Sequence, residues 1–331
     1  MKQFITLGEM PVEEIEQLLR LAKQLEASPI NESLKGKTVA LLFMNPSLRT
    51  LASFQAGVAQ LGGNVFVIQP GAGSWNLEVE DGAVMDGASQ EHIRDAIPVL
   101  GGYADALAVR CFAAGKDLAT DLTDGLIRKM AAMSPVPFIN MESAAAHPCQ
   151  ALADWKTLDD LEAPRAGGKF VLSWAWHPRP LPYAVPISAA EMALLRGMDL
   201  TISAPEGFDL PQETMHQLGK LGKVTVTRDP LEATEGAHAI YAKSWCAPAF
   251  YGKPEEEAEA RKELRHWCAN ESWFENADPS ARFMHCLPVR RNVEVTDDVI
   301  DGPRSATLQQ AKNRLHVQKA VMAAMLGDAS Q

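Results

Sequence analysis

The chain has 331 residues, enough for two ordinary domains, and its 47% hydrophobic and 22% charged content is that of a soluble globular protein. A net charge of −11 argues against nucleic acid as a partner, and any anionic substrate would need a locally positive pocket. No apolar run reaches the roughly 18 residues of a membrane span, and the N-terminus lacks the apolar core of a signal peptide. The chain has five cysteines, an odd number without a Cys-x-x-Cys pair, which argues against a disulfide framework and a structural zinc site. We therefore expect the protein in the cytoplasm.

Hydrophobic periodicity predicts an amphipathic helix over residues 12–27, followed by short apolar strands that alternate with helical stretches. The strands expected in the first half cover residues 38–44, 64–68, 106–110 and 137–140. Those expected in the second half cover residues 169–176, 199–203, 224–227, 237–242 and 282–286. A helix over about 147–162, a linker over 163–168 and a last helix over 308–326 complete the pattern. Such alternation indicates an α/β protein with two doubly wound parallel sheets.

Polar or functional side chains recur at the carboxyl end of these strands, which is where ligands bind in open α/β sheets. The residues at or just beyond strand ends are Arg49, Trp75, Arg110, Glu142, His177, Lys243 and Leu287. Two such edges facing each other would form a cleft between the domains, and we expect the ligands to bind there.

The segment Met44-Asn45-Pro46-Ser47-Leu48-Arg49-Thr50 joins the first long strand to a helix. It offers two hydroxyls, a guanidinium group and the unpaired N–H groups of the helix start, all of which can bind a phosphate. Taken alone, Ser and Thr at a helix start are more often caps. The phosphate interpretation depends on motifs further along the chain.

Those motifs are His147-Pro148-Cys149-Gln150 and His285-Cys286-Leu287-Pro288, the latter followed by Val289-Arg290-Arg291. With the phosphate segment, they resemble the transcarbamylase family, which transfers a carbamoyl group from carbamoyl phosphate to an amine. The family's phosphate motif is Ser-x-Arg-Thr-Arg, and Leu51 here replaces its second arginine. Within the family, Met85-Asp86-Gly87 and Tyr241–Trp245 resemble the branch that acts on N-acylated ornithine, as does the proline-rich segment at 177–182.

The resemblance implies a carbamoyl phosphate-binding domain over residues 1–145, to which a C-terminal helix at 305–331 returns, and an acylornithine-binding domain over 146–304. It implies catalytic roles for Arg49, Arg110 and His147. The residues implied to bind carbamoyl phosphate are Ser47, Leu48, Arg49, Thr50, Trp75, Arg110, His147, Gln150, Cys286, Leu287 and Arg314. Trp75 would serve the neighbouring subunit's site in a homotrimer, and no metal or organic cofactor is needed.

The residues implied to bind the acylornithine are Glu142, His177, Lys243, Leu287, Arg290 and Gln90. Ordinary ornithine transcarbamylases carry an acidic segment for the free α-amino group, whereas this chain has the cation Lys243 there. The acyl group stays open between acetyl and succinyl, with a slight lean to succinyl from the segments around His177 and Arg290. At the position of Gln90, acetyl-type enzymes resemble one another in having a glutamate, and succinyl-type enzymes in having a proline.

Two other functions stay open: an ordinary ornithine transcarbamylase, and a paralogue that keeps the fold without turnover. A Cys286 nucleophile is rejected, because carbamoyl phosphate is already activated and a covalent intermediate would gain little. Gly71-Ala72-Gly73 lacks the third glycine of a dinucleotide site, and the Asp81 and Asp86 pair has too few ligands for calcium. The run Glu255-Glu256-Glu257 with Glu259 is interpreted as a solvated helix face.

Overall fold

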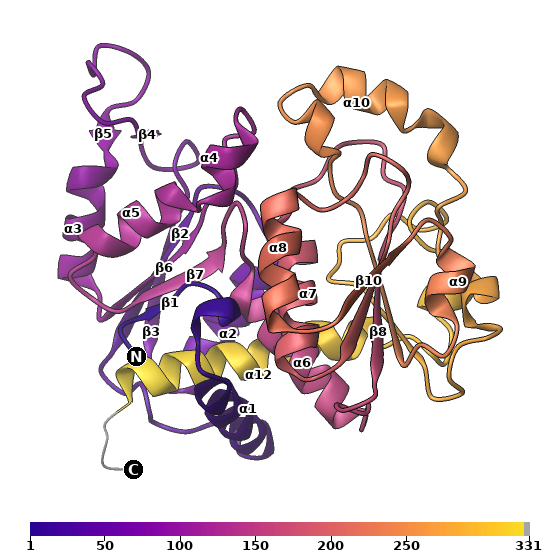
Figure 1. Cartoon of the computed structure of the whole chain (residues 1–331). Helices are drawn as coiled ribbons and strands as arrows, with labels where there is room; N and C mark the ends of the chain where they lie inside the picture. Colours follow the sequence, from indigo (N-terminus) through magenta and orange to yellow (C-terminus); the bar gives the residue numbers. More distant parts are fainter. Residues whose placement is uncertain (328–331) are drawn as a thin grey trace. The chain divides into compact units, whose positions relative to one another are not determined.

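A computed structural model describes residues 1–327, and the chain divides into two units (Figure 1). Unit 1 comprises Met1–Ala113, Leu122–Cys149 and Arg314–Gln331, and unit 2 comprises Ala114–Asp121 and Gln150–Asn313. The last four residues of the predicted C-terminal segment lie outside the described part. Each unit is built on one five-stranded parallel sheet, which confirms the predicted α/β fold class.

The helices and strands alternate along most of the chain, with the following bounds. The strands are β1 (Gln3–Phe4), β2 (Thr38–Phe43), β3 (Asn64–Ile68), β4 (Leu77–Glu78), β5 (Glu91–His92), β6 (Ala106–Arg110), β7 (Phe138–Glu142), β8 (Lys169–Trp174), β9 (Asp199–Ser203), β10 (Val224–Thr227), β11 (Ala239–Lys243) and β12 (Arg282–Met284). The α-helices are α1 (Val12–Ala27), α2 (Leu48–Gln60), α3 (Ile93–Tyr103), α4 (Leu118–Leu122), α5 (Gly125–Met133), α6 (Pro148–Asp160), α7 (Ala184–Leu195), α8 (Gln212–Leu221), α9 (Pro230–Thr234), α10 (Pro254–Ala260), α11 (Asp297–Ile300) and α12 (Thr307–Leu326).

The sheet of unit 1 has the order β1-β7-β6-β2-β3. Side chains of β2 and β6 alternate between its faces, and Leu42, Leu107 and Val109 pack with Ile97 and Met130 in one core cluster. Figure 1 shows α3 and α5 on one side of this sheet and α1, α2 and α12 on the other. Because the chain goes from β2 outward to β3 and then returns to β6 on the opposite side, the winding reverses between β2 and β6.

The sheet of unit 2 has the order β10-β9-β8-β11-β12. Its core cluster includes Val171, Ile240 and Phe283 from the strands, together with Trp273 and Phe274. Figure 1 shows α7 and α8 on one side of this sheet and α9 on the other. The winding here reverses between β8 and β11, since β9 and β10 extend the sheet in one direction and β12 in the other.

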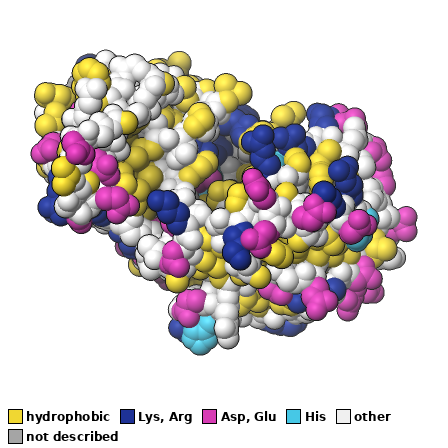
Figure 2. Space-filling view, turned by 90° about the horizontal axis from the view of Figure 1, so that it is seen from above, with side chains coloured by type: hydrophobic (Ala, Val, Ile, Leu, Met, Phe, Trp, Pro, Cys, Tyr) yellow, Lys and Arg dark blue, Asp and Glu magenta, His cyan; other side chains and the backbone are white. Residues whose placement is uncertain are grey.

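Acidic and basic side chains are interspersed with hydrophobic ones on the face shown in Figure 2. None of the described helices is long and apolar enough to cross a membrane. Within residues 1–327, no group of three or more His, Cys, Asp or Glu side chains is arranged to hold a metal ion.

Candidate active site

The reversal between β2 and β6 in unit 1 coincides with the predicted phosphate segment. Ligands of open α/β sheets bind where the winding reverses, outside the carboxyl ends of the strands. Residues 44–50 follow β2 directly, and Arg110 is the last residue of β6. The Asn45 side-chain oxygen accepts a hydrogen bond from the Phe112 N–H at 2.8 Å, which ties the two segments together beyond the strands.

The phosphate segment is shaped by the start of α2. Ser47 is the N-cap, and its hydroxyl accepts a hydrogen bond from the Thr50 N–H at 3.3 Å. The N–H groups of Leu48 and Arg49 lie in the first turn, where a helix provides no internal acceptor. The Leu48 side chain is 81% exposed, so we expect this residue to contact a phosphate through its backbone N–H and not through its side chain. Leu51, which replaces the family's second arginine, is partly buried one residue further on.

Arg314 of α12 reaches this segment from the C-terminal end of the chain. Its side chain is buried, and one guanidinium nitrogen donates to the Thr50 hydroxyl at 3.0 Å. Thr50 is itself 1% exposed. The structure therefore places Arg314 beside the helix start that the sequence predicts to bind phosphate.

Arg110, Glu142 and His147 form a buried group within unit 1. Arg110 forms an ion pair with Glu142, and its guanidinium lies over the Phe112 ring at 4.6 Å. The His147 Nε2 lies 3.3 Å from the same Glu142 carboxylate. Glu142 is the last residue of β7, which extends two residues beyond the predicted strand end at Asn140. It is thus joined to two residues expected to bind carbamoyl phosphate.

The surroundings of His147 favour its neutral form. Burial lowers its pKa well below the usual value, and the positive charges of Arg314, Arg110 and Arg49 lower it further. A neutral imidazole carries one N–H and can donate it to a carbonyl oxygen. The three arginines lie close enough to affect His147, so unit 1 has a concentrated positive site in a chain of net charge −11.

Gln150 begins a buried hydrogen-bond network in unit 2 that the sequence analysis did not detect. The Gln150 side-chain nitrogen donates to Asp154 at 2.7 Å, and that of Gln310 donates to the same carboxylate oxygen at 2.8 Å. The Gln310 oxygen accepts from the His285 N–H at 2.9 Å. Because Asp154 only accepts, it binds the nitrogen of the Gln150 amide and turns the Gln150 oxygen away from itself. The i, i+4 spacing of Gln150 and Asp154 on a helix was the available signal.

The His285–Leu287 segment follows β12. Leu287 has a φ of 54°, in the left-handed region that a leucine rarely occupies, and its N–H donates to the His285 Nδ1 at 2.9 Å. Residues held in that region occur often at ligand sites. Cys286 is partly buried and not part of a disulfide.

The acylornithine residues His177, Lys243 and Arg290 all lie in unit 2. His177 follows β8 and Lys243 ends β11, the two strands between which the winding of this sheet reverses. The Arg290 Nε donates to the His177 Nε2 at 2.9 Å. Lys243 is buried, and its charge is among those that lower the pKa of His177.

Trp75 is 59% exposed and Gln90 is exposed, and both lie on surface segments of unit 1 outside the arginine group.

Glu294 lies beneath this part of unit 2. The side chain is buried; one carboxylate oxygen accepts from the Arg290 N–H at 2.8 Å, and the other lies 3.6 Å from the His285 Nε2. Burial alone would raise the pKa of Glu294, but the nearby His285 imidazole, the charge of Lys243 and the hydrogen bond from the Arg290 N–H lower it to about 2.

Comparisons with known proteins match both units to one family. Residues 2–160 match the aspartate/ornithine carbamoyltransferase carbamoyl-P binding domain, and residues 184–325 match the Asp/Orn binding domain of the same family. The chain belongs to the aspartate/ornithine carbamoyltransferase family. The resemblance that the sequence motifs predicted is confirmed.

Among carbamoyltransferases, the chain is 40% identical to the N-acetylornithine carbamoyltransferase of Xanthomonas campestris over 99% of its length and 98% of the relative's. It is also 40% identical to the N-succinylornithine carbamoyltransferase of Bacteroides thetaiotaomicron, covering 85% and 84% of the two chains. A crystal structure of acetylornithine transcarbamylase complexed with acetylcitrulline matches with a TM-score of 0.95 at 40% identity, covering 99% of this chain and 100% of that one. These similarities support the predicted N-acylornithine branch of the carbamoyltransferases.

Proposed function

We propose that the protein transfers a carbamoyl group from carbamoyl phosphate to the δ-amine of an α-N-acylated L-ornithine, giving an N-acylcitrulline and phosphate in arginine biosynthesis. The observation that carries the proposal is the grouping of Arg49, Arg110 and Arg314 around a neutral His147 at the strand ends of unit 1. Three permanent cations and a helix start suit a phosphate dianion, and a neutral imidazole suits a carbonyl oxygen.

The proposed chemistry needs no covalent enzyme intermediate. The lone pair of the neutral δ-amine forms a bond to the carbamoyl carbon while the carbonyl electrons move to oxygen. Thr50, Arg110 and His147 stabilise that developing negative charge. The carbon–oxygen bond to phosphate then breaks, and phosphate leaves with the bonding pair and accepts the proton of the amine. Catalysis comes mainly from orientation and electrostatics.

Gln150, Cys286 and Leu287 complete the carbamoyl site in this proposal. Asp154 holds the nitrogen of Gln150, so the Gln150 oxygen accepts from the carbamoyl NH2 group. The backbone carbonyls of Cys286 and Leu287 accept from the same NH2 group and from the attacking amine. The positive φ of Leu287 supports a constrained backbone at this position.

The acylornithine binds through its carboxylate and its amide. Lys243 and Arg290 are the proposed partners of the α-carboxylate and an acyl oxygen, and Glu142 meets the substrate's amide or amine. A buried cation at Lys243 disfavours a free α-ammonium group, which separates this substrate from ornithine. Relatives named for acetyl- and for succinylornithine are both 40% identical to the chain, over 99% and 85% of its length respectively, so both substrates belong in the assay.

We further propose a cytoplasmic homotrimer in which Trp75 serves a neighbouring subunit's site. The exposure of the Trp75 side chain in the single chain supports such a role. Five free cysteines are compatible with a reducing compartment.

Steady-state assays with carbamoyl phosphate and four amines test the function: N-acetylornithine, N-succinylornithine, ornithine and aspartate. We expect kcat/KM for one acylated ornithine to exceed that for ornithine by about a hundredfold or more, the ratio that an unpaired buried charge can impose. A preference for ornithine would point to the ordinary transcarbamylase, and no turnover with any amine would point to a non-catalytic paralogue.

A further inference from the structure

Arg261 lies entirely within the protein, although the sequence placed its partner on a solvated surface. Glu257 was interpreted as part of an exposed acidic face, and that interpretation is wrong: its side chain is 1% exposed and forms an ion pair with Arg261, which is 0% exposed. A buried ion pair costs desolvation energy that its mutual attraction often fails to offset. We therefore expect the Glu257–Arg261 ion pair to have a function other than stabilising unit 2.

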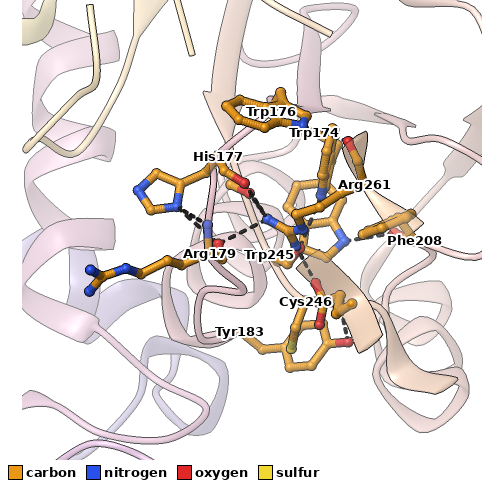
Figure 3. A network of polar contacts seen from close by, with 11 residues as sticks. Trp174, Trp176, His177, Arg179, Tyr183, Phe208, Trp245, Cys246 and Arg261 are labelled. Carbon is orange, nitrogen blue, oxygen red and sulfur yellow. Dashed lines mark hydrogen bonds and ion pairs between the residues drawn. The ribbon is translucent and has the colours of Figure 1, made fainter. Parts of the chain in front are cut away.

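The guanidinium of Arg261 joins two segments that follow neighbouring strands (Figure 3). One terminal nitrogen donates to the His177 carbonyl at 2.7 Å and to the Arg179 carbonyl at 2.9 Å, in the segment after β8. The other donates to the Trp245 carbonyl at 3.1 Å, in the segment after β11. These are the segments that carry His177 and Lys243.

Aromatic side chains fix the guanidinium in place. It lies 5.4 Å from the Trp174 ring centre and 5.5 Å from that of Phe208. The indole N–H of Trp174 donates to the Trp245 carbonyl at 3.0 Å, and the indole N–H of Trp176 donates to the Arg261 carbonyl at 2.6 Å. Figure 3 shows these rings gathered around Arg261.

The network also determines which nitrogen of His177 carries the proton. Arg290 can only donate, so the His177 Nε2 that it contacts at 2.9 Å must accept. Burial lowers the pKa of His177 and favours the neutral ring. With Nε2 as the acceptor, the single proton is assigned to Nδ1, which lies 2.9 Å from the Arg179 carbonyl oxygen and 3.1 Å from the Arg179 N–H nitrogen. In this tautomer Nδ1 cannot accept from the N–H, and it donates to the carbonyl. That carbonyl is one of the two that Arg261 holds in this segment.

We propose that Arg261 is a positioning residue for the acylornithine-binding residues of unit 2. Held by Glu257, it fixes the backbone after β8 and after β11, and so sets the orientation of His177, of the Arg290 bonded to it, and of Lys243. The inference rests on the proposed function for the substrate, but the arrangement of His177 can be tested without turnover.

The kinetic test uses Arg261→Lys and Glu257→Gln, with Lys262→Met as the matched control. Lys262 follows Arg261 in the sequence and forms an exposed ion pair with Glu259. We expect the KM for the acylornithine to rise about tenfold or more in both test variants, because small misplacements of binding groups are costly. The dissociation constant of carbamoyl phosphate should stay within twofold, and the control should match the wild type.

The second measurement is ¹⁵N NMR of the histidine side chains without substrate, with His177→Gln used to assign the signal. The wild type should show a neutral His177 ring protonated on Nδ1, and both test variants should show a mixture of tautomers. If Arg261→Lys fails to fold, Glu257→Gln and Ser244→Ala carry the test, since Ser244 lies 3.4 Å from the same guanidinium.

An unchanged His177 signal together with an unchanged acylornithine KM would overturn the proposal. An equal weakening of carbamoyl phosphate binding would also overturn it, because that result indicates a general loss of structure. If the wild type turned over no acylornithine, the proposed function would fail, while the NMR result would still decide whether Arg261 positions His177.

Discussion

Arg49, Arg110 and Arg314 place positive charge around His147 in a chain whose overall field repels anions. The cost of bringing three cations together in a partly buried site is offset when a dianion binds, so we expect the arrangement to be selective for phosphate-bearing ligands over neutral ones.

Arg49→Ala should lower kcat/KM by about a hundredfold or more. Loss of one charge-assisted contact to a phosphate dianion costs about 3 kcal/mol. Steady-state kinetics over a range of carbamoyl phosphate concentrations measures the effect. Arg20→Ala, on the exposed face of α1, is the control. Near-normal activity of Arg49→Ala would refute the phosphate assignment.

Asp154→Asn should raise the KM for carbamoyl phosphate about tenfold, since an amide no longer dictates which end of Gln150 it binds. The effect should pass through Gln150 and through Gln310, which binds the same carboxylate oxygen. Adding Asp154→Asn to the double variant Gln150→Ala with Gln310→Ala should therefore cause no further loss. Additive losses in this cycle would show that Asp154 acts by another route.

At the scale of elements, the segment from His285 to Glu294 combines a strained leucine with a buried carboxylate. The pKa of Glu294 falls from 4.5 to about 2 on folding. A carboxyl group with a lowered folded-state pKa stabilises the fold above its unfolded pKa, and the contribution is lost as the pH falls through the folded pKa.

We therefore predict that the wild type has a larger free energy of unfolding than Glu294→Gln, and that this difference is largest above pH 5. The difference should shrink by about 3 kcal/mol as the pH falls toward 2, which is the shift in pKa converted at 1.36 kcal/mol per unit. Urea unfolding at several pH values measures it. The exposed Glu206→Gln serves as control. A difference that does not depend on pH would contradict the ionised state of Glu294.

The regular elements were predictable where local pattern and tertiary context agree. The bounds of β3, β6, β9 and β10 match the expected strands residue for residue, and α1 matches the expected helix. Strands β1, β4 and β5 could not be predicted from the sequence, because a strand of two residues shows no periodicity.

The motifs of the candidate site could be proposed from the sequence because their residues lie in short contiguous segments. The supporting residues could not. Some of their partners are far away in the sequence, as for Gln310 with Asp154 and for Arg261 with the His177 carbonyl. Other partners are four residues away on the same helix, as for Gln150 with Asp154, and such a pair resembles an ordinary helix pair. Glu257 resembled a surface residue because its neighbours Glu255 and Glu256 are exposed, and only the position of Arg261 explains its burial.

At the scale of the whole molecule, the proposed trimer predicts hybrid active sites. A Trp75→Ala variant and an Arg110→Ala variant, each nearly inactive, should regain activity when mixed and reassembled. In randomly mixed trimers about one site in four would combine an intact Trp75 with an intact Arg110. Activity after mixing measures this, and unmixed samples treated alike are the control. An active monomer by light scattering would contradict the shared site.

The acyl preference should depend on Gln90. A glutamate at this position would repel the second carboxylate of a succinyl group, whereas Gln90 fills similar space without charge. Gln90→Glu should therefore shift the ratio of kcat/KM values toward acetylornithine over succinylornithine. Glu91→Gln, at the next position, is the control. An unchanged ratio in Gln90→Glu would show that residue 90 does not face the acyl group.

Helix α12 has a consequence for the synthesis of the protein. Besides Arg314, it supplies Lys319, whose ammonium group donates to the Leu25 and Pro29 carbonyls at 2.9 and 3.0 Å. Unit 1 is therefore assembled from segments that lie far apart in the sequence. A nascent chain that already contains Arg49, Arg110 and His147 still lacks the arginine that contacts Thr50. We therefore expect phosphate binding to stay weak until residue 314 has been synthesised and α12 has packed onto unit 1.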